Sequence, residues 1–341
     1  MRLKALFVGE LWNGSTGVHR ADALSKNGLE VYTIDITKKV NSFKGFWFRV
    51  FHKLHYNLDI NGNNKTIIEK IGSNDFNILW LDKCTHINKK TLQLVRKINS
   101  KISIIGYSPD DMMNPNNQTS QFRKALPYYD VFITTKSYNV PELSNLGCKN
   151  VLFIGNSFDP NIHKPIELSE EEENSLRSEI GFIGSYEDDR CQKMISLANA
   201  GFKITITGKE WEGRCNHENI EVRPKNLWAL DYAKAINATT INLCFLRKAN
   251  RDLQTTRSIE IPACKGFMLA ERTEEHKELF TENEEAVYFE SESELIEKVR
   301  FYLNNKDAIK LISEKGYARC FESGYSNFSR LEKVLNILQV L

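Results

Sequence analysis

Short apolar stretches that alternate with helix-forming segments are the feature of this sequence that most constrains its fold. In the first half of the chain they recur at residues 5–9, 30–36, 78–82, 102–106, 131–135 and 150–154. Each stretch has the length of a buried strand, and segments of helical character or turns separate them. This alternation predicts a doubly wound α/β fold with a mostly parallel sheet.

The alternation resumes at Ile180. Strands are expected at residues 180–183, 202–207, 240–245 and 267–270, and helices at 188–200, 228–238, 292–303 and from 307 to the end. Between the two series, Pro160, Pro165 and the acidic run 170–173 are typical of a linker, placed at about residues 156–178. We therefore expect two tandem Rossmann-like domains, residues 1–158 and 159–324, with the functional site in a cleft between them.

Charge and cysteine content narrow the class of protein. The chain of 341 residues has 46 Lys and Arg against 44 Asp and Glu, interspersed, so we expect no nucleic-acid partner. No apolar run reaches the roughly 18 residues that span a bilayer, and the N-terminal apolar stretch is too short for a signal peptide. Seven scattered cysteines without a Cys-x-x-Cys pair favour a reduced, cytoplasmic protein.

Residues 255–271 place a carboxylate, Glu260, at the start of a short apolar helix that ends near Gly266 and leads into a strand. In open α/β sheets, ligands bind at the carboxyl ends of strands. A helix N-terminus favours phosphate, which a carboxylate cannot bind, so Glu260 suits a pair of sugar hydroxyls such as those of a ribose. Asp252, eight residues upstream, is a candidate for hydrogen bonding to a donor sugar.

Cations and hydroxyls gather in three loops that follow expected strands. The Gly184-Ser185 turn opens a helix bearing Arg190, and backbone amides, a hydroxyl and a guanidinium together suit a diphosphate. The other candidates for donor binding are Lys209, Arg247, Lys248, Arg251, Thr256 and Arg257. Cations there would neutralise a leaving diphosphate. The alternative is a solvated, charged loop.

Three further residues are candidates for acid–base work. His19 begins the first helix and is either a general base or a surface histidine. Asp110 and Asp111 directly follow a strand, where either could bind an acceptor hydroxyl or take its proton. The alternative for both is a turn and helix cap. Because His and Cys show no ligand spacing, we expect no metal.

The segment 38–55 mixes aromatic and basic residues and lacks acids. As a helix from Phe46 it suits docking on an anionic lipid surface, and the alternative is a helix that covers one side of the sheet.

Several motifs together resemble the group 1 glycosyltransferases of bacteria, in particular their spore-maturation type. The segment Arg257-Ser258-Ile259-Glu260-Ile261-Pro262-Ala263-Cys264 is similar to the donor-site helix of that family. Further similar segments are residues 128–137, 151–154, 159–165, 180–185, 271–276, 279–280 and 294–296. The resemblance covers most of the chain from about Ile102 onward.

The resemblance implies a GT-B fold, in which two Rossmann-like domains face a cleft and a last helix, here residues 325–341, returns to the first domain. It implies transfer of a sugar from a nucleotide diphosphate sugar without a metal or other cofactor, and a contact between Glu260 and the ribose. Retaining relatives carry two glutamates where this chain has Asp252 and Glu260, so retention of configuration is one possible outcome. The implied acceptor is a hydroxyl of a cell-envelope glycan, a lipid-linked glycan or a protein.

Two other functions are compatible with the same fold. One is a nucleotide-sugar epimerase, which needs no acceptor. The other is a nucleotide- or glycan-binding protein without catalysis. For the transferase, the sequence predicts a cytoplasmic location, with segment 38–55 as a peripheral contact to the inner face of the membrane.

Overall fold

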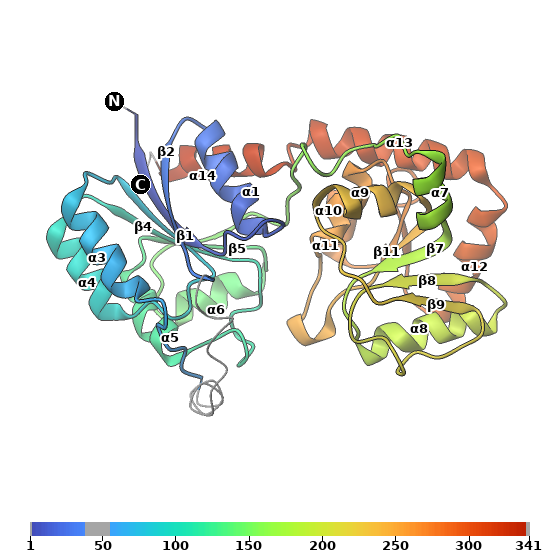
Figure 1. Ribbon diagram of the computed structural model, residues 1–341, viewed down its shortest axis with the longest axis horizontal. Helices are drawn as coiled ribbons and strands as arrows, with labels where there is room; N and C mark the ends of the chain where they lie inside the picture. The colour runs from blue at the N-terminus through green and yellow to red at the C-terminus, as the bar shows by residue number, and fades with distance from the viewer. Residues whose placement is uncertain (1, 38–54, 339–341) are drawn as a thin grey trace. The chain divides into compact units, whose positions relative to one another are not determined.

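The computed structural model describes residues 2–37 and 55–338. The chain divides into two compact units, Met1–Gly155 with Asn327–Leu341, and Asn156–Ser326. Each unit is built around one six-stranded sheet in which all neighbouring strands are parallel (Figure 1). The predicted α/β class with two Rossmann-like sheets is confirmed.

The sheet of the first unit has the order β2-β1-β3-β4-β5-β6. Its strands are β1 (Lys4–Gly9), β2 (Glu30–Asp35), β3 (Ile78–Asp82), β4 (Ser103–Ser108), β5 (Val131–Thr134) and β6 (Val151–Phe153). All of them lie within two residues of the expected positions. Central strand β3 is buried along its whole length, which its unbroken apolar run explains.

Helices cover both faces of this sheet. One face packs against α3 (Asn63–Ser73), α4 (Lys89–Ile98), α5 (Ser120–Ala125) and α6 (Asn139–Asn145), and a short 3₁₀ turn, Leu126–Tyr128, follows α5. The other face packs against α1 (Thr16–Lys26) and α14 (Asn327–Leu338), as Figure 1 shows. The two termini of the chain therefore belong to the same unit.

The sheet of the second unit has the order β12-β11-β10-β7-β8-β9. Its strands are β7 (Ser178–Ile183), β8 (Ile204–Thr207), β9 (Ile220–Arg223), β10 (Thr239–Cys244), β11 (Met268–Glu271) and β12 (Val287–Phe289). The two edge strands, β9 and β12, were not predicted. β9 alternates apolar with charged residues and so lacks an apolar run, and β12 is an apolar run of only three residues.

In this unit α8 (Asp188–Asn199), α12 (Glu292–Leu303) and the first part of α13 (Lys306–Glu322) pack on one face. The other face carries α9 (Ala229–Asn237), α10 (Arg257–Ala263) and α11 (Glu274–Leu279). A 3₁₀ turn, Lys248–Asn250, lies between β10 and α10.

The acidic run that was interpreted as linker forms a helix, α7 (Glu170–Leu176). Ser169 and Glu172 form a capping box at its start, and its first turn is entirely acidic, which favours a helix through the dipole. The acidic residues of the expected linker are thus helical.

The expected helix from residue 307 to the end is interrupted at Ser323–Ser326. Gly324 has a positive φ of 65°, and Ser326 bridges to Phe158. Beyond this break, α14 packs against α1, where Asn27 Nδ2 donates to the Phe328 carbonyl across 3.0 Å. A last helix that returns to the first unit was predicted and is confirmed.

Candidate functional site

A buried ion pair underlies the carboxyl ends of β1, β3 and β4 in the first unit. Arg20 of α1 donates from Nε and Nη2 to both carboxylate oxygens of Asp82, across 2.6 and 2.7 Å. Its guanidinium carbon lies 4.2 Å from the centroid of the Tyr107 ring. Burial opposes the charge of Arg20, but Asp82 outweighs it, so the pKa of Arg20 is raised.

A second pair lies at the same strand ends. Lys83, which has a left-handed backbone (φ 55°), places Nζ 2.9 Å from Asp110, and these side chains are 36% and 25% exposed. Burial would lower the pKa of Lys83, but Asp110 raises it. Of the two predicted acids, Asp110 is therefore the accessible one.

Asp111 is buried and tied into its own loop. Its Oδ1 accepts from Asn139 Nδ2 at 3.0 Å and from the Met113 backbone at 2.9 Å. These contacts correspond to the turn-and-cap alternative for Asp111. His19 is half-buried in the first turn of α1, the helix that follows β1, one residue before Arg20.

In the second unit, the predicted Gly184-Ser185 turn follows β7. Its two carbonyl groups point into the protein: Trp211 Nε1 donates to Gly184 O at 2.8 Å, and Arg190 Nη1 donates to Ser185 O at 2.9 Å. In a trans peptide the N–H points opposite to the C=O. Among the described residues, the N–H groups of Ser185 and Tyr186 have no acceptor, so this turn presents two free donors.

Arg190 lies beneath the turn and is 1% exposed. Besides Ser185 O, it donates from Nε to Leu246 O at 3.2 Å, whereas its buried Nη2 has no hydrogen-bond partner. Burial and then the charge of Arg257 lower the pKa of Arg190 to about 10.

Arg257, at the start of α10, approaches the turn from the other side. A Cβ on Gly184 would lie 3.2 Å from Arg257 Nη1, and Nε of Arg257 is buried without a hydrogen-bond partner. Among the described residues, no carboxylate forms an ion pair with Arg190 or Arg257. The turn thus combines free N–H groups with two cations that lack a counter-ion, which is the chemistry of an anion site.

Glu260 is 8% exposed and lies one helical turn after Arg257. Its Oε2 accepts from the Tyr232 hydroxyl at 3.0 Å, and its Oε1 lies 3.6 Å from His163 Nε2. Burial and the Glu260 charge raise the pKa of Tyr232 well above its usual value. The Tyr232 contact fixes the Glu260 side chain.

The predicted cationic loop after β10 is held by acids. Glu187 accepts from Arg247 Nε at 3.2 Å and from the Lys248 backbone at 3.1 Å. Asp252 accepts from Asn250 Nδ2 at 2.9 Å and is half-buried. The Arg247 side chain therefore pairs with Glu187, whereas Lys248 contacts Glu187 only through its backbone and its Nζ lies 3.9 Å from Glu271 Oε2.

The remaining predicted residues are more peripheral. Arg251 is exposed, with a left-handed backbone (φ 46°), and Thr256 is the N-cap residue of α10 without a side-chain cap hydrogen bond. Lys209 is exposed after β8. Gly208 beside it packs so closely on the Gly184 carbonyl that a side chain would not fit.

Sequence reasoning missed a buried polar network behind the turn. Glu271, the last residue of β11, accepts from the Leu246 backbone N–H at 3.2 Å, and its other oxygen lies 3.3 Å from Lys193 Nζ. His276 lies 2.6 Å from Glu271 O through Nδ1 and 2.7 Å from Ser258 Oγ through Nε2. Burial lowers the pKa of His276 to about 4, so it is neutral at pH 7. Its sequence spacing from the other members carries no recognisable signal.

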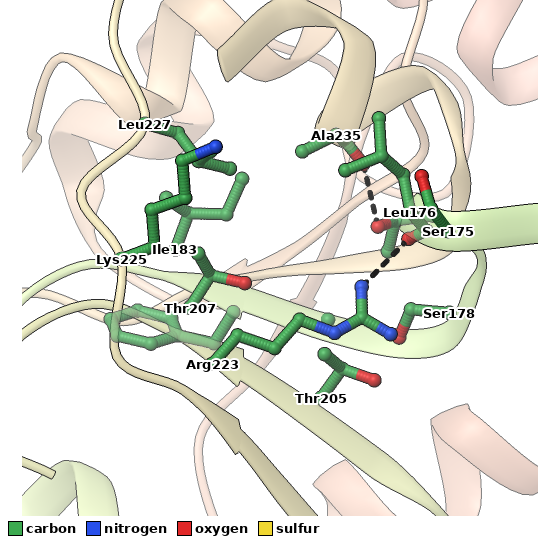
Figure 2. Close-up of a pocket in the computed structure, with 13 residues that line it drawn as sticks. Ser175, Leu176, Ser178, Ile183, Thr205, Thr207, Arg223, Lys225, Leu227 and Ala235 are labelled. Atoms are coloured by element: carbon green, nitrogen blue, oxygen red, sulfur yellow. Dashed lines mark hydrogen bonds between the residues drawn. The ribbon is translucent and has the colours of Figure 1, made fainter. Parts of the chain in front are cut away.

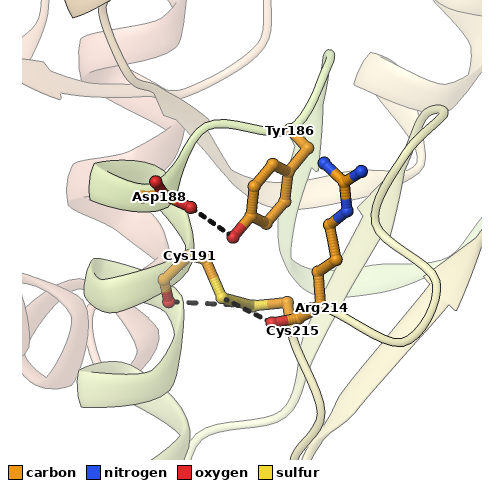
Figure 3. The surroundings of a disulfide bond; sticks show 5 residues. All are labelled: Tyr186, Asp188, Cys191, Arg214 and Cys215. Carbon is orange, nitrogen blue, oxygen red and sulfur yellow. Dashed lines mark hydrogen bonds between the residues drawn. A yellow bond between two sulfur atoms is a disulfide. The ribbon is translucent and has the colours of Figure 1, made fainter.

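A disulfide joins Cys191, in the first turn of α8, to Cys215, with the two Cα atoms 5.7 Å apart (Figure 3). Beside it, the Arg214 guanidinium lies 5.0 Å from the centroid of the Tyr186 ring. The other five cysteines are free and buried. The prediction of a wholly reduced chain was therefore wrong for this pair, because the two cysteines meet only when the segment before β9 folds back onto α8.

A hollow of about 240 Å³ lies on the face of β7 and β8 that α9 covers only in part (Figure 2). Thr207 and Lys225 line its end nearest the carboxyl edge of the sheet, and Ile183 and Leu227 supply apolar surface. Arg223 is directed to the opposite wall, where it donates to Leu176 O at 3.2 Å.

In the described part of the chain, no group of three His, Cys, Asp or Glu side chains is arranged to hold a metal ion. Nor does any helix in residues 2–37 and 55–338 have the length and apolar character to cross a membrane. The predicted interfacial helix at 38–55 lies, except for His55, outside the described residues.

Comparison with known proteins places this geometry in context. Residues 190–336 match the family model "Glycosyl transferase-like". The structure is similar to a glycosyltransferase from Rickettsia africae (15% identity, 98% of this chain and 97% of that chain, TM-score 0.66). It is also similar to HepE of Anabaena in complex with UDP and glucose (11% identity, 99% and 100%, TM-score 0.65).

A third similar structure is a Listeria monocytogenes protein assigned as a UDP-N-acetylglucosamine 2-epimerase (10% identity, 99% and 96%, TM-score 0.60). No curated protein sequence matches the chain. The chain therefore has the two-unit GT-B fold of glycosyltransferases, and its residues 190–336 match a glycosyl transferase-like family.

Proposed function

We propose that this protein is a glycosyltransferase that moves a sugar from a nucleotide diphosphate sugar to an acceptor hydroxyl. The observation that carries the proposal is the Gly184-Ser185 turn, with two free N–H groups and two guanidinium groups without a carboxylate partner. The match of residues 190–336 to a glycosyl transferase-like family supports the same reaction class.

In the proposed mechanism, the diphosphate lies on the turn. The N–H groups of Ser185 and Tyr186 and the guanidinium of Arg257 contact its oxygens, while Arg190 adds positive charge from beneath. Negative charge grows on the diphosphate as the sugar leaves. Fixed donors and cations stabilise that charge, which is electrostatic catalysis by a preorganised site.

Glu260 accepts hydrogen bonds from the ribose hydroxyls in this arrangement. Its carboxylate is fixed by Tyr232, and oxygen lone pairs remain for two further donors. The hollow of Figure 2 takes the nucleobase, because Ile183, one of its lining residues, immediately precedes the turn. Asp252 is proposed to hydrogen-bond the donor sugar.

The finer assignments rest on the resemblance and on the first unit. We propose a metal-independent transferase, acting in the cytoplasm on a cell-envelope glycan or a lipid-linked or protein acceptor, with retention of configuration as one outcome. Asp110 and His19 are the candidates to bind the acceptor hydroxyl or take its proton, since Asp110 lies at the end of β4 and His19 in the first turn of the helix after β1.

The direct test is calorimetry with UDP, GDP and dTDP on the wild type and on Glu260→Ala. The variant should bind the preferred nucleotide at least tenfold more weakly, because a fully desolvated charged hydrogen bond is lost. Glu274→Ala is the matched control, since that carboxylate is 84% exposed and pairs only with Lys277. If the wild type binds none of the nucleotides, the proposal is wrong.

A nucleotide-sugar epimerase is the second candidate, favoured by the structural likeness to the Listeria monocytogenes protein. Incubation with a nucleotide sugar alone distinguishes the two: an epimerase converts the sugar without an acceptor, whereas a transferase releases nucleoside diphosphate only as it transfers or hydrolyses the sugar. A binding protein without catalysis gives neither product.

A further inference from the structure

Glu271 has no role in the function proposed above. It is a carboxylate that is only 7% exposed, and it lies in the unit to which that proposal assigns the anion site. Its position explains this. It ends β11, and the strand order β11-β10-β7 places the ends of these three strands next to one another. Residues 271, 246 and 184 are thus neighbours in space although they are far apart in sequence.

Three hydrogen bonds connect Glu271 to the turn. Glu271 Oε2 accepts from Leu246 N–H at 3.2 Å, Leu246 O accepts from Arg190 Nε at 3.2 Å, and Arg190 Nη1 donates to Ser185 O at 2.9 Å. Leu246 therefore connects the Glu271 carboxylate to the Arg190 guanidinium, through its backbone N–H on one side and its backbone carbonyl on the other. Arg190 in turn holds the carbonyl whose inward direction exposes the Tyr186 N–H.

Two lysines lie near the Glu271 carboxylate, and one of them, Lys193, also pairs with Asp189. Lys193 Nζ lies 3.3 Å from Oε1, and Lys248 Nζ lies 3.9 Å from Oε2. The Glu271 carbonyl is also fixed, by His276. Glu271 is therefore a buried hydrogen-bond acceptor with lysines beside it, behind the turn rather than on its anion-binding side.

We infer that Glu271 is a positioning residue for the diphosphate, acting through Leu246 and Arg190 on the Gly184-Ser185 turn. This inference rests on the proposed function, because it assigns a support to the anion site of that proposal. It predicts that the length of the side chain at position 271 affects the affinity for nucleoside diphosphate more than its charge does.

Two conservative variants of Glu271 distinguish the effect of side-chain length from the effect of charge. Glu271→Gln keeps the length of the side chain and an oxygen that can accept from Leu246 N–H, but it loses the charge. Glu271→Asp keeps the charge but is one methylene too short to reach that N–H. Calorimetric Kd values for a nucleoside diphosphate and for the matching nucleoside are measured for both variants and for Glu274→Asp, an exposed control on α11.

The inference predicts that Glu271→Asp binds the nucleoside diphosphate at least tenfold more weakly, with nucleoside affinity unchanged, whereas Glu271→Gln stays within threefold of the wild type for both ligands. Circular dichroism establishes that each variant is folded. The inference is overturned if Gln weakens diphosphate binding as much as Asp, if Asp binds like the wild type, or if nucleoside binding falls in parallel.

The same experiment distinguishes this failure from failure of the proposed function. If the wild type binds no nucleoside diphosphate, the proposed function is wrong, and the inference falls with it. If the wild type binds and Arg257→Met weakens binding but Glu271→Asp does not, only the role of Glu271 is wrong.

Discussion

The guanidinium groups of Arg190 and Arg257 lie against the same aromatic ring, 5.4 and 5.5 Å from the centroid of Phe182. Two like charges this close repel each other, and each has a buried nitrogen without an acceptor. Cation–π contact with Phe182 offsets part of that repulsion. An anion at the neighbouring turn would offset more, so ligand binding and relief of repulsion are expected to be coupled.

Arg257→Met should lower the affinity for nucleoside diphosphate at least tenfold, because a charge-assisted contact to phosphate is lost. Removing one of two repelling cations should at the same time leave the thermal stability of the free protein unchanged or higher. Arg300→Met is the control, since Arg300 also lies over a ring, that of Phe202, but is an exposed residue of α12. Equal affinities of the two variants, measured by calorimetry, would exclude Arg257 from the site.

Stability should fall on acidification because of His276. Its pKa is about 4 in the folded protein and about 6.5 when exposed in the unfolded chain, so between these values the unfolded state binds more protons. The contribution of neutral, buried His276 to the free energy of unfolding is full above pH 6.5. It decreases by about 1.4 kcal/mol per pH unit as the pH falls toward 4.

Denaturant titrations of the wild type and of His276→Gln at several pH values measure this effect. The variant should be less stable at pH 7, because a neutral ring that packs on Tyr288 is lost, and the difference should shrink toward pH 4.5. A difference that stays constant with pH would mean that His276 does not titrate in this range.

Thiol titration in denaturant without reductant should find five reactive thiols per chain, because two of the seven cysteines are paired. Cys215→Ser should lower the free energy of unfolding by about 3 kcal/mol, the usual contribution of a disulfide that closes a loop of this size. Seven reactive thiols would contradict the pairing.

In the first unit, Asp82→Ala should destabilise the protein by about 3–5 kcal/mol, because Arg20 is left buried and unpaired. The double variant Arg20→Met with Asp82→Leu should recover much of that loss, since no buried charge remains. Denaturant unfolding measures both. A double variant as unstable as the single one would show that the pair contributes through packing, not charge.

Asp110→Asn offers the contrasting case. Its partner Lys83 is 36% exposed, so the stability change should be within about 1 kcal/mol. If Asp110 receives the acceptor proton, the transfer rate should fall by about 100-fold or more, with nucleotide affinity unchanged. An unaltered rate would leave His19 as the candidate base.

Local patterns in the sequence were sufficient for most of the fold. The strand expected at 78–82 coincides with β3, because its apolar run is continuous. The helix expected at 292–303 coincides with α12, because its apolar pattern is periodic and has clear ends. Ile220–Arg223 was missed because an edge strand with charged residues lacks such a pattern. Gly184, Ser185 and Glu260 were chosen as candidates because each lies at a strand end or helix start.

The sequence by itself thus determined the order of strands and helices and the loops that lie at the carboxyl edges of the sheets, since these follow from short-range periodicity. Only the tertiary structure decided which loops meet. Strand β10 lies between β7 and β11, which brings Glu271 to Leu246 and Leu246 to Arg190, and the chain before β9 folds back to pair Cys215 with Cys191. Such contacts depend on the crossing of non-consecutive strands, and no spacing along the chain encodes them.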